Sequence, residues 1–537
     1  MATTGRPRGR HGAREGVDAR RGYGRIATRT GAHLAVATVV AVAPLIAPAS
    51  AYAQKWSIDA GISSELSWTS NAELGQLGGR DDTILDIRPN IRLRGEGGRL
   101  KFSGTAALSA ITYANHTQPS RLEPEADLRA ELEAIERLLF LEAGLRALQT
   151  SANPFGARPE TGATSENSIT TSQARFAPRI EGAAGDRLRY RLSSDNSWTH
   201  ESGSTAATTG VPDSAGYFGR HAVRIEQDPQ PLGWRIEGER SETRYRDASQ
   251  EPLVLDTARV TLNYGIGSEW TLGVHAGRER TSFVTEDGRR DLYGVDVRWR
   301  PSPRTLFSVL QEHRVFGSAW RAAVEHRTPQ FALSMVSARA LDTTPQSVFD
   351  LPATDNVAAL IDAAFTTRYP DPIERARIVQ DFIARQGLPP STLQPISLRA
   401  QRLSLVTLHS ATVTLIGTRN SVSLTGYKTR TEDAIDTGPF ALGTAATNND
   451  QYGAAIALSH RLSPTMSLIA SADWSRIRAL EAVGGERSTQ RTARVRLNVE
   501  TGRKTTAYAG ARYRDLDSNT VESGREGAIF VGLDHRF

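Results

Sequence analysis

The chain has 537 residues, of which 39% are hydrophobic, and it contains no cysteine. So low a hydrophobic fraction in a chain long enough for several domains argues against one large conventional core. The absence of cysteine excludes disulfide frameworks, thiolate metal sites and cysteine nucleophiles. The formal charge of +6 comes from residues 1–53, which are rich in arginine, and the rest of the chain is formally neutral. A global basic surface for nucleic acid is therefore excluded.

Residues 1–53 have the composition of an export signal. An arginine-rich stretch precedes a short apolar run at residues 34–46, and the sequence Ala-Tyr-Ala at residues 51–53 has the small-x-small form of a signal-peptidase site. The apolar run is shorter than the roughly 20 residues of a spanning helix. We therefore expect a cleaved signal, with a membrane anchor as the alternative, and an exported body at residues 54–537.

In this body, apolar and polar side chains alternate again and again over segments of strand length. Leu188, Tyr190 and Leu192 alternate with arginines, and the same period of two recurs in residues 270–276, 293–299, 452–458 and 493–499. The body has no apolar stretch of helical membrane length. Many strands with one apolar face then predict an all-β fold, a single large antiparallel transmembrane β-barrel.

The connections between these segments fall into two classes that alternate along the chain. The short class is rich in turn residues and lies near residues 95–98, 184–186, 267–268, 301–303, 328–329, 418–420, 463–464 and 502–503. The long class includes residues 71–81, 151–168, 201–214, 435–448 and 478–487. Alternate short turns and long loops predict about 22 strands, within a range of about 18–24, with both chain ends on the periplasmic side.

Residues 131–148 have the composition of a helix, yet apolar residues alternate in both halves of the segment. We expect a β-hairpin there, with a helix as the alternative. The final segment, residues 527–537, is also a predicted strand and ends in an aromatic residue. Gly532, His535 and Phe537 resemble the insertion signal that the barrel-assembly machinery reads in outer-membrane proteins. The expected location is the outer membrane of a Gram-negative cell, in contact with outer-membrane lipid and lipopolysaccharide.

Residues 343–397 interrupt the strand pattern with two helix signatures. Phe365 belongs to a first apolar stripe at helical spacing, and a second helix is predicted to begin at the cap Asp371, to carry Phe382 on its apolar face and to end at Gly387. Because short turns and long loops alternate along the chain, this insertion is expected to start at the extracellular rim of the barrel. It is either a gate, as a lid or partial plug, or a helical loop packed on itself.

The polar faces of the strands are rich in arginine. Because side chains alternate between the two faces of a strand, these arginines are predicted to point into the lumen. An excess of arginine there would favour anionic solutes. Ion pairing across the wall is the alternative. The charges predicted to line the lumen are Arg187, Arg189, Arg191, Arg235, Arg298, Arg300, Arg494, Arg496, Glu237 and Glu239.

The sequence contains no motif of a hydrolase, a phosphate-binding loop or a metalloenzyme. Histidines occur singly in separate strands, so we predict no catalytic residues, no metal site and no cofactor. A barrel hydrolase whose residues converge only in three dimensions is the remaining enzymatic alternative.

Four segments resemble landmarks of one protein family: residues 138–143 (LLFLEA), 153–156 (NPFG), 371–389 and 417–421 (GTRNS). The chain is similar over nearly all of its body to the outer-membrane β-barrel proteins associated with the PEP-CTERM/exosortase system. The resemblance implies a role in making, exporting or displaying extracellular polymer, with exopolysaccharide or export components as partners. It implies no catalytic residues.

The leading interpretation is a non-enzymatic pore or conduit associated with exopolysaccharide or surface-protein export. A non-conducting scaffold that anchors matrix components is the alternative. A TonB-dependent transporter would have a similar number of strands, but strand-like sequence begins near Trp56 and leaves no space for an N-terminal plug domain.

Overall fold

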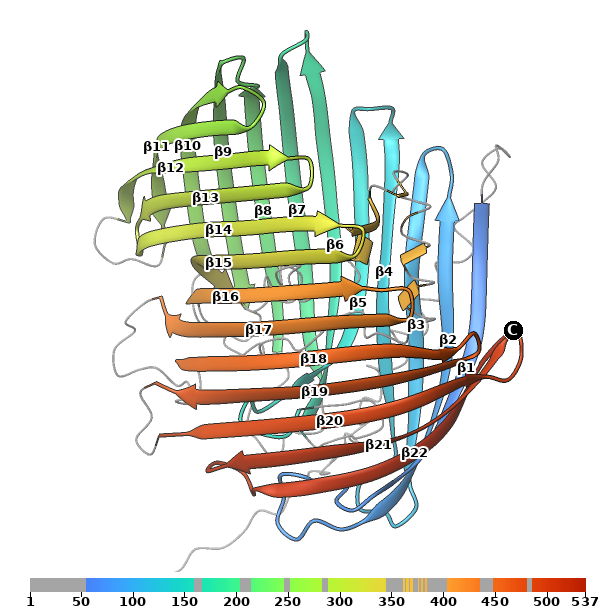
Figure 1. Ribbon diagram of the computed structural model, residues 1–537. Helices are drawn as coiled ribbons and strands as arrows, with labels where there is room; N and C mark the ends of the chain where they lie inside the picture. The colour runs from blue at the N-terminus through green and yellow to red at the C-terminus, as the bar shows by residue number, and fades with distance from the viewer. Residues whose placement is uncertain are drawn as a thin grey trace, which may run out of the picture. The chain divides into compact units, whose positions relative to one another are not determined.

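The computed structural model describes residues 55–158, 167–202, 214–245, 252–282, 288–343, 403–434, 448–480 and 485–537, with scattered residues between 361 and 383. It is one sheet of 22 strands (Figure 1). The first eleven are β1 (Lys55–Thr69), β2 (Asp82–Glu96), β3 (Leu100–Tyr113), β4 (Arg121–Ile135), β5 (Leu139–Ser151), β6 (Ser168–Ala184), β7 (Leu188–Ser202), β8 (Ser214–Gln227), β9 (Leu232–Tyr245), β10 (Leu253–Ile266) and β11 (Trp270–Thr281). The other eleven are β12 (Arg289–Ser302), β13 (Thr305–Arg314), β14 (Gly317–Thr328), β15 (Phe331–Thr343), β16 (Leu403–Ile416), β17 (Asn420–Asp433), β18 (Asn449–Ser463), β19 (Met466–Ala479), β20 (Arg487–Glu500), β21 (Thr505–Ser518) and β22 (Gly524–Arg536).

The sheet closes on itself. Each strand pairs with the next one in sequence, and β1 also pairs antiparallel with β22, from Gly61 opposite Arg536 to Thr69 opposite Ala528. Closure removes both sheet edges, which leaves no row of unpaired backbone groups along the wall. The predicted all-β fold and the count of 22 strands are confirmed.

The two ends of the barrel differ. At one end, here the short-turn end, the connections are tight, such as residues 97–99, 185–187 and 329–330. At the other, the long-loop end, they include residues 70–81 and 152–167. The β13–β14 connection is an exception, because residues 315–316 form a tight turn at the long-loop end, with Gly317 at φ 93° directly after it.

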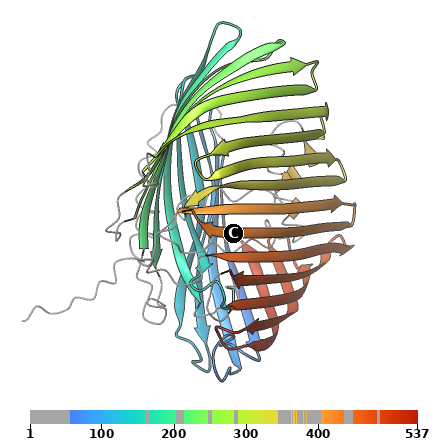
Figure 2. The same cartoon turned by 90° about the vertical axis from the view of Figure 1, so that its left-hand side faces the viewer.

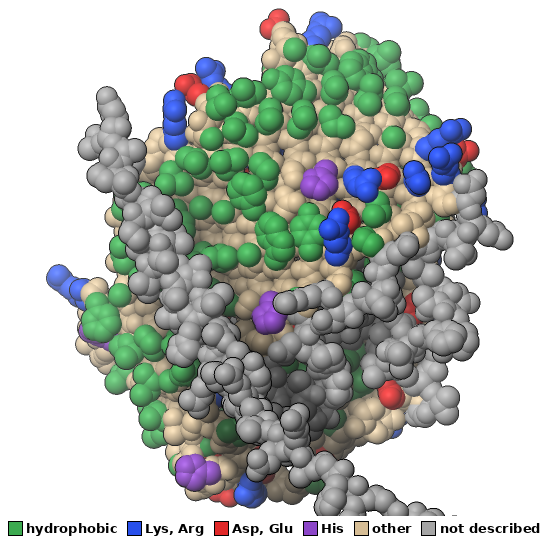
Figure 3. Space-filling view, turned by 180° about the vertical axis from the view of Figure 1, so that it is seen from behind, with side chains coloured by type: hydrophobic (Ala, Val, Ile, Leu, Met, Phe, Trp, Pro, Cys, Tyr) green, Lys and Arg blue, Asp and Glu red, His purple; other side chains and the backbone are tan. Residues whose placement is uncertain are grey.

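The outer face of the barrel is apolar. Leu192 is 47% exposed and Val223, its partner in the register, is 42% exposed. Figure 3 shows hydrophobic side chains spread over much of the wall seen from behind. Side chains alternate across a strand, so polar residues between these positions face the lumen. The strands therefore have the polarity of a barrel that meets lipid outside and water inside.

Aromatic side chains border this apolar face at both ends. At the short-turn end, the rings of Trp270 and Trp299 stack with centroids 5.0 Å apart, and Phe307 stacks on Trp299 at 4.9 Å. Near the long-loop end, the ring centroids of Trp198 and Tyr217 lie 5.8 Å apart. Rings at these two levels match the aromatic girdles of membrane barrels.

Residues 131–148 form a hairpin, as predicted. β4 and β5 pair from Ala126 opposite Ala147 to Ile135 opposite Leu139, and Arg137 takes a φ of 53° in the turn between them. Most apolar residues of both strands, such as Leu132 and Leu145, face outward to lipid. Exposure to lipid on that face, rather than helix propensity, decides the structure of this segment. The predicted signal, residues 1–53, lies outside the described residues.

The insertion between β15 and β16 is described only in part. β15 extends to Thr343 and β16 begins at Leu403, so the insertion is longer than the predicted 343–397. Described residues with helical conformation are Ile361, Asp362, Ala364, Phe365, Arg375, Ile378, Val379, Phe382 and Ile383. These residues do not delimit a complete helix, so the pair of helices stays a prediction. Asp371 and Gly387 lie outside the described residues.

Candidate functional site: the lumen

Ion pairs cover much of the inner wall. On β8–β10, Glu237 forms ion pairs with Arg224 (2.6 Å), Arg235 (3.1 Å) and Arg259 (3.4 Å). On β6 and β7, Arg191 pairs with Glu181 at 2.8 Å. Each arginine reaches a carboxylate on its own strand or the next one, which is how cross-strand pairs stabilise a sheet. This part of the wall, here called the charged wall, is the inward face of β6–β10.

Most of the predicted lumen charges belong to such pairs. The paired residues are Arg189 (with Glu226 and Asp228), Arg191 (Glu181), Arg235 and Glu237 (each other), Glu239 (Arg220), Arg494 (Glu65) and Arg496 (Asp534). Arg187 lies in the β6–β7 turn, at the rim rather than on the wall. The alternative given by the sequence, mutual pairing, therefore holds for these positions.

Arg298 and Arg300 differ from the others. Both face the lumen from β12, both are exposed, and neither has an ion-pair partner in the part of the chain that the structure describes. Arg321 on β14 shares these properties, and sequence reasoning missed it. These three guanidinium groups, here called the open arginines, are available to an anion in the lumen.

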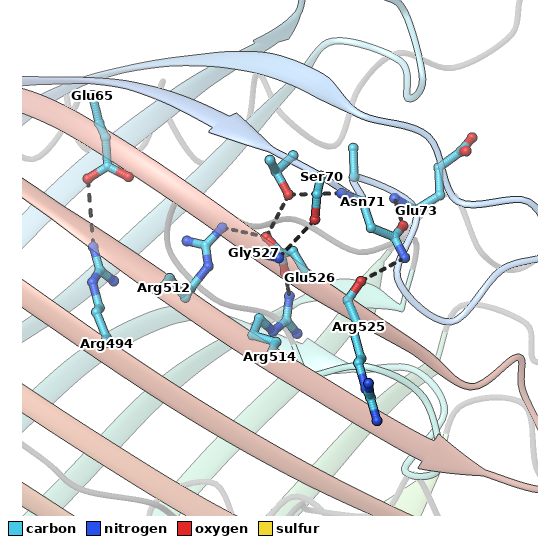
Figure 4. Close-up of polar contacts among 12 residues, drawn as sticks. Glu65, Ser70, Asn71, Glu73, Arg494, Arg512, Arg514, Arg525, Glu526 and Gly527 are labelled. Carbon is cyan, nitrogen blue, oxygen red and sulfur yellow. Dashed lines mark hydrogen bonds and ion pairs between the residues drawn. The ribbon is translucent and has the colours of Figure 1, made fainter.

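A buried cluster lies where the barrel closes (Figure 4). Glu526 on β22 accepts from Arg512 at 2.7 Å and from Arg514 at 3.2 Å, and the Thr69 hydroxyl of β1 donates to it at 2.9 Å. All three charged side chains are at most 3% exposed. The cluster joins β21, β22 and β1, and burial makes removal of one partner costly.

Gly532 of the predicted insertion signal is explained by packing near this seam. A Cβ at Gly532 would lie 2.3 Å from the ring of Tyr508. That ring crosses the strand so that its hydroxyl donates to Glu65 at 3.1 Å, while the Arg496 guanidinium lies 3.5 Å from the ring centroid. At the end of the chain, the rings of His535 and Phe537 meet edge to face at 5.2 Å. Their recognition by assembly machinery stays a prediction.

The loop after β5 folds across the long-loop end of the lumen. Phe155, 2% exposed, packs on Ile477 and Ala479 of β19. The backbone N–H of Arg158 donates to Gln490 at 3.0 Å, and its guanidinium donates to the Tyr427 hydroxyl at 3.1 Å. Residues 152–158, here called the mouth strap, therefore connect β5 with strands on another side of the barrel and narrow its mouth.

The loop between β1 and β2 packs beside the mouth strap. Leu74 and Ala157 form a buried cluster with Leu516 of β21. Within the loop, the Arg80 guanidinium donates to the Glu73 carboxylate at 2.8 Å and holds the pKa of that carboxyl below its usual range. The long-loop end is thus partly closed by described residues.

The inner wall of β15–β18 has a different composition. Among the side chains that the structure describes there, the inward ones are uncharged except Asp433 and Arg461 near the strand ends. Hydroxyl groups pair with each other, Thr412 with Thr425 at 3.1 Å and Thr414 with Ser423 at 3.2 Å. This neutral wall consists of Ala332, Ser334, Val336, Ala338, Ala340, Val406, Leu408, Ser410, Thr412, Thr414, Ile416, Ser421, Ser423, Thr425, Tyr427, Thr429, Thr431, Gln451, Gly453, Ala455, Ala457 and Ser459.

Residues of the insertion pack on this neutral wall. Ile361, Ala364 and Val379, each at most 3% exposed, form one apolar cluster with Ala332 and Ile416. Those two wall residues face inward near the short-turn end, although β15 and β16 join the insertion at the opposite end. Figures 1 and 2 both place the coloured pieces of the insertion inside the ring of strands. The described residues of the insertion therefore lie within the lumen and contact its wall near the short-turn end.

The two described parts of the insertion also contact each other. The rings of Phe365 and Phe382, both predicted gate residues, meet edge to face at 5.5 Å, and Arg375 donates to Asp362 at 2.9 Å. We refer to the described residues between 361 and 383 as the plug. The sequence held a signal for its contact surface, because the inward positions of β15–β18 lack the charges found on the other strands.

The described residues contain no group of three or more His, Cys, Asp or Glu side chains that could hold a metal ion. Hydroxyl–histidine contacts occur, between Ser194 and His221 (2.9 Å) and between Ser337 and His409 (3.0 Å), but on outward positions. Neither histidine has a carboxylate partner within the described ranges. Nor do these ranges contain a helix long and apolar enough to cross a membrane.

No family model and no curated protein matches the sequence. Solved structures do match. The siderophore receptor PirA from Acinetobacter baumannii has a TM-score of 0.45 at 9% identity, over 90% of this chain and 81% of that one. The FrpB iron transporter from Neisseria meningitidis gives 0.42 at 9%, over 89% and 82%, and OccAB4 from A. baumannii gives 0.34 at 9%, over 90% and 99%. The chain is an outer-membrane-type β-barrel, as its closed wall and apolar exterior show.

Proposed function

We propose that this protein is a gated, non-enzymatic conduit of the outer membrane, and that the insertion is its gate. The observation that carries the proposal is the apolar cluster of Ile361, Ala364 and Val379 with Ala332 and Ile416 inside the barrel. A loop that only decorated the rim would not contact the wall near the opposite end. An element packed within the lumen obstructs it, and obstruction by a segment joined only at its two ends is reversible.

The charged wall supports a passage beside the plug. Its ion pairs lie on strands away from β15–β18, so the plug and the charged wall occupy different sectors of the ring. A water-filled lumen tolerates such side chains because water solvates the charges that the pairs leave partly exposed. The open arginines Arg298, Arg300 and Arg321 lie on strands between the two sectors and favour anionic solutes there.

The cargo we propose belongs to exopolysaccharide or surface-protein export. The support is the resemblance of residues 138–143, 153–156 and 417–421 to a family associated with such systems, together with a lumen that presents open arginines. An acidic polysaccharide would meet guanidinium groups without requiring a catalytic group. The proposal is therefore transport rather than hydrolysis.

Conductance of the refolded barrel in a planar bilayer tests the gate. The register supplies a clean deletion, because β15 and β16 remain paired up to Thr343 opposite Leu403. Residues 344–402 can therefore be replaced by an Asn-Gly turn, which suits a two-residue hairpin. We expect low conductance of the full chain and at least a tenfold increase in the deletion variant. Loss of the heat-dependent shift in gel mobility would show that the deletion variant misfolds. Point variants of the plug would then be recorded in place of the deletion.

The mouth strap and the buried neutral wall favour one second candidate, a scaffold that conducts little. Thr412, Thr414, Ser421 and Ser423 are completely buried, so this sector of the lumen is filled. If the folded deletion variant conducts no better than the full chain, the gate is wrong and the scaffold is favoured. Pull-down with extracellular polymer would then locate its binding loop.

A further inference from the structure

We propose that the outer face of β14–β19 binds a phosphate-bearing glycolipid of the outer leaflet, through three cations above an apolar groove. This site requires the barrel to span an outer membrane but does not require it to conduct. These strands form the wall nearest the viewer in Figure 1. The proposal depends on outward side chains, which the lumen and its gate do not use.

The cations are Arg339 on β15, Lys428 on β17 and Arg476 on β19. Each faces outward, as do the lipid-exposed Met335, Leu424 and Trp474 at the same parity on these strands. None of the three cations has an ion-pair partner in the parts of β14–β19 that the structure describes. A cation without a carboxylate partner at the level of lipid headgroups is free to bind an anion.

Two of these cations are held in place by aromatic rings. The Arg339 guanidinium lies 5.8 Å from the ring centroid of Trp320 and donates to the Ser318 carbonyl at 3.3 Å. The Lys428 ammonium lies 5.5 Å from the ring of Tyr452. Cation–π contacts orient both side chains and leave most of their hydrogen-bond donors available. Such a pair is preorganised for a phosphate group.

Three outward cations of β9–β12 are instead paired with carboxylates. On β9–β12, Arg240 pairs with Asp256 at 3.4 Å, Arg278 pairs with Asp291 at 3.3 Å, and Arg244 pairs with Glu242. Those charges are satisfied within the protein. These three paired arginines therefore provide control positions with the same charge at a comparable height on the barrel.

The groove lies next to Arg339 and Lys428, toward the short-turn end. It has a volume of about 490 Å³, and its outward lining is formed by Ala322, Val324, Met335, Ser337, His409, Ala411 and Gly426. Small side chains at Ala322, Ala411 and Gly426 make the hollow. The groove lies farther from the long-loop end than the cations do, at the level of lipid acyl chains.

One polar chain crosses this otherwise apolar groove. The Trp320 indole donates to the Ser337 hydroxyl at 3.0 Å, and that hydroxyl contacts Nδ1 of His409 at 3.0 Å. His409 is exposed, and its Nε2 has no hydrogen-bond partner within the described strands. His409 lies directly opposite Lys428 in the register, so the ester or amide groups next to a headgroup would meet this nitrogen. A phosphorylated glycolipid thus offers a group for each part of the surface: phosphate for the cations, linkage for His409 and acyl chain for the groove.

Binding of purified lipid A to the refolded full chain, measured by native mass spectrometry, tests the proposal. The variant R339A/K428A/R476A should bind about 100-fold more weakly, since each cation near an anionic headgroup contributes about a factor of five. The matched control R240A/R244A/R278A should bind like the parent chain. Dephosphorylated lipid A should bind the parent as weakly as lipid A binds the triple variant.

Equal binding by the parent and the triple variant, or an equal loss in the control, would overturn the proposal. So would a second copy of the chain on this face without lipid. If the triple variant does not fold, Lys428→Gln alone should weaken binding about fivefold. Ala411→Trp, which fills the groove and leaves the cations in place, should also weaken binding, and unchanged affinity would remove the groove from the site.

Discussion

The charged wall of β6–β10 and the neutral wall of β15–β18 belong to the same sheet but have opposite inner surfaces. On the charged wall, arginines such as Arg191 and Arg224 reach carboxylates across the register. On the neutral wall, Thr412 and Ser423 point inward with hydroxyl groups that pair with their neighbours, and both are completely buried. The first surface is built to meet water, and the second is built to meet protein.

This difference shows that the outward and the inward side chains of a barrel strand follow separate sequence patterns. Outward residues are mostly apolar on all described strands, so their pattern mainly reports the membrane. Inward residues vary from sector to sector, and a sector without charge marks where an internal element packs. Ala332 and Ile416 are apolar residues at inward positions of the neutral wall, and the plug contacts them.

The largest effect should come from placing one charge in each wall. Ser423→Lys buries an ammonium group without a partner, at a cost on the order of 3 kcal/mol, which displaces the plug and raises conductance several-fold. Ser193→Lys makes the same change on the inward face of β7, where Ser193 is only half-buried beside charged residues. Planar-bilayer recording compares them. Equal conductance of the two variants would remove the distinction between the walls.

A second test separates open from paired arginines. Reversing Arg298, Arg300 and Arg321 to glutamate should shift the anion-to-cation permeability ratio on the order of tenfold toward cations, because their charges are not neutralised. Removing the pair Arg191–Glu181 together, as R191Q/E181Q, should leave that ratio nearly unchanged. Reversal potentials in a salt gradient measure both. A cation preference in the parent barrel would contradict the anionic cargo.

A third test concerns the mouth strap. Phe155→Ala removes a buried ring from Ile477 and Ala479 and should loosen residues 152–158 by about 3 kcal/mol without unfolding the barrel. Protease cleavage in the strap should then speed up. Leu77→Ala is the control, because that side chain is 83% exposed. Equal cleavage of both variants would show that Phe155 does not anchor the strap.

The smallest effect should be a pH dependence of the loop at residues 70–81. Arg80 lowers the pKa of Glu73, so this pair stabilises the loop above the normal glutamate pKa. The contribution is lost as pH falls through the lowered value. The protection factors of the loop amides, which correct for the pH dependence of chemical exchange, should fall about twofold on acidification, a modest change because water screens Arg80. Glu73→Gln should abolish the dependence, and an unchanged pH response in that variant would contradict it.

Period two in the sequence was sufficient for the barrel itself. The alternation of Leu188, Tyr190 and Leu192 reflects the local geometry of a strand. The alternation in the hairpin at residues 131–148 reflects it in the same way. Both depend only on neighbours along one strand and on a shared lipid environment. The number of strands follows from turn positions, which are likewise local.

The site could be predicted only in part. Arg235 and Arg300 look alike in sequence, but one meets Glu237 and the other meets no carboxylate in the described strands. The mouth strap and the plug cross the lumen, so their contacts join residues far apart in the chain, such as Phe155 with Ile477. Such contacts leave no periodic trace. The uncharged inward face of β15–β18 was the available signal.

The most direct test of the account is to tether the plug to the wall. The chain has no cysteine, so Ala332→Cys with Ile361→Cys gives a single thiol pair, and a short reducible crosslinker can join them. We predict efficient crosslinking in the folded barrel, low conductance while the tether is intact, and recovery of parental gating on reduction. Failure to crosslink, or gating that continues with the tether in place, would contradict a plug that opens by leaving the neutral wall.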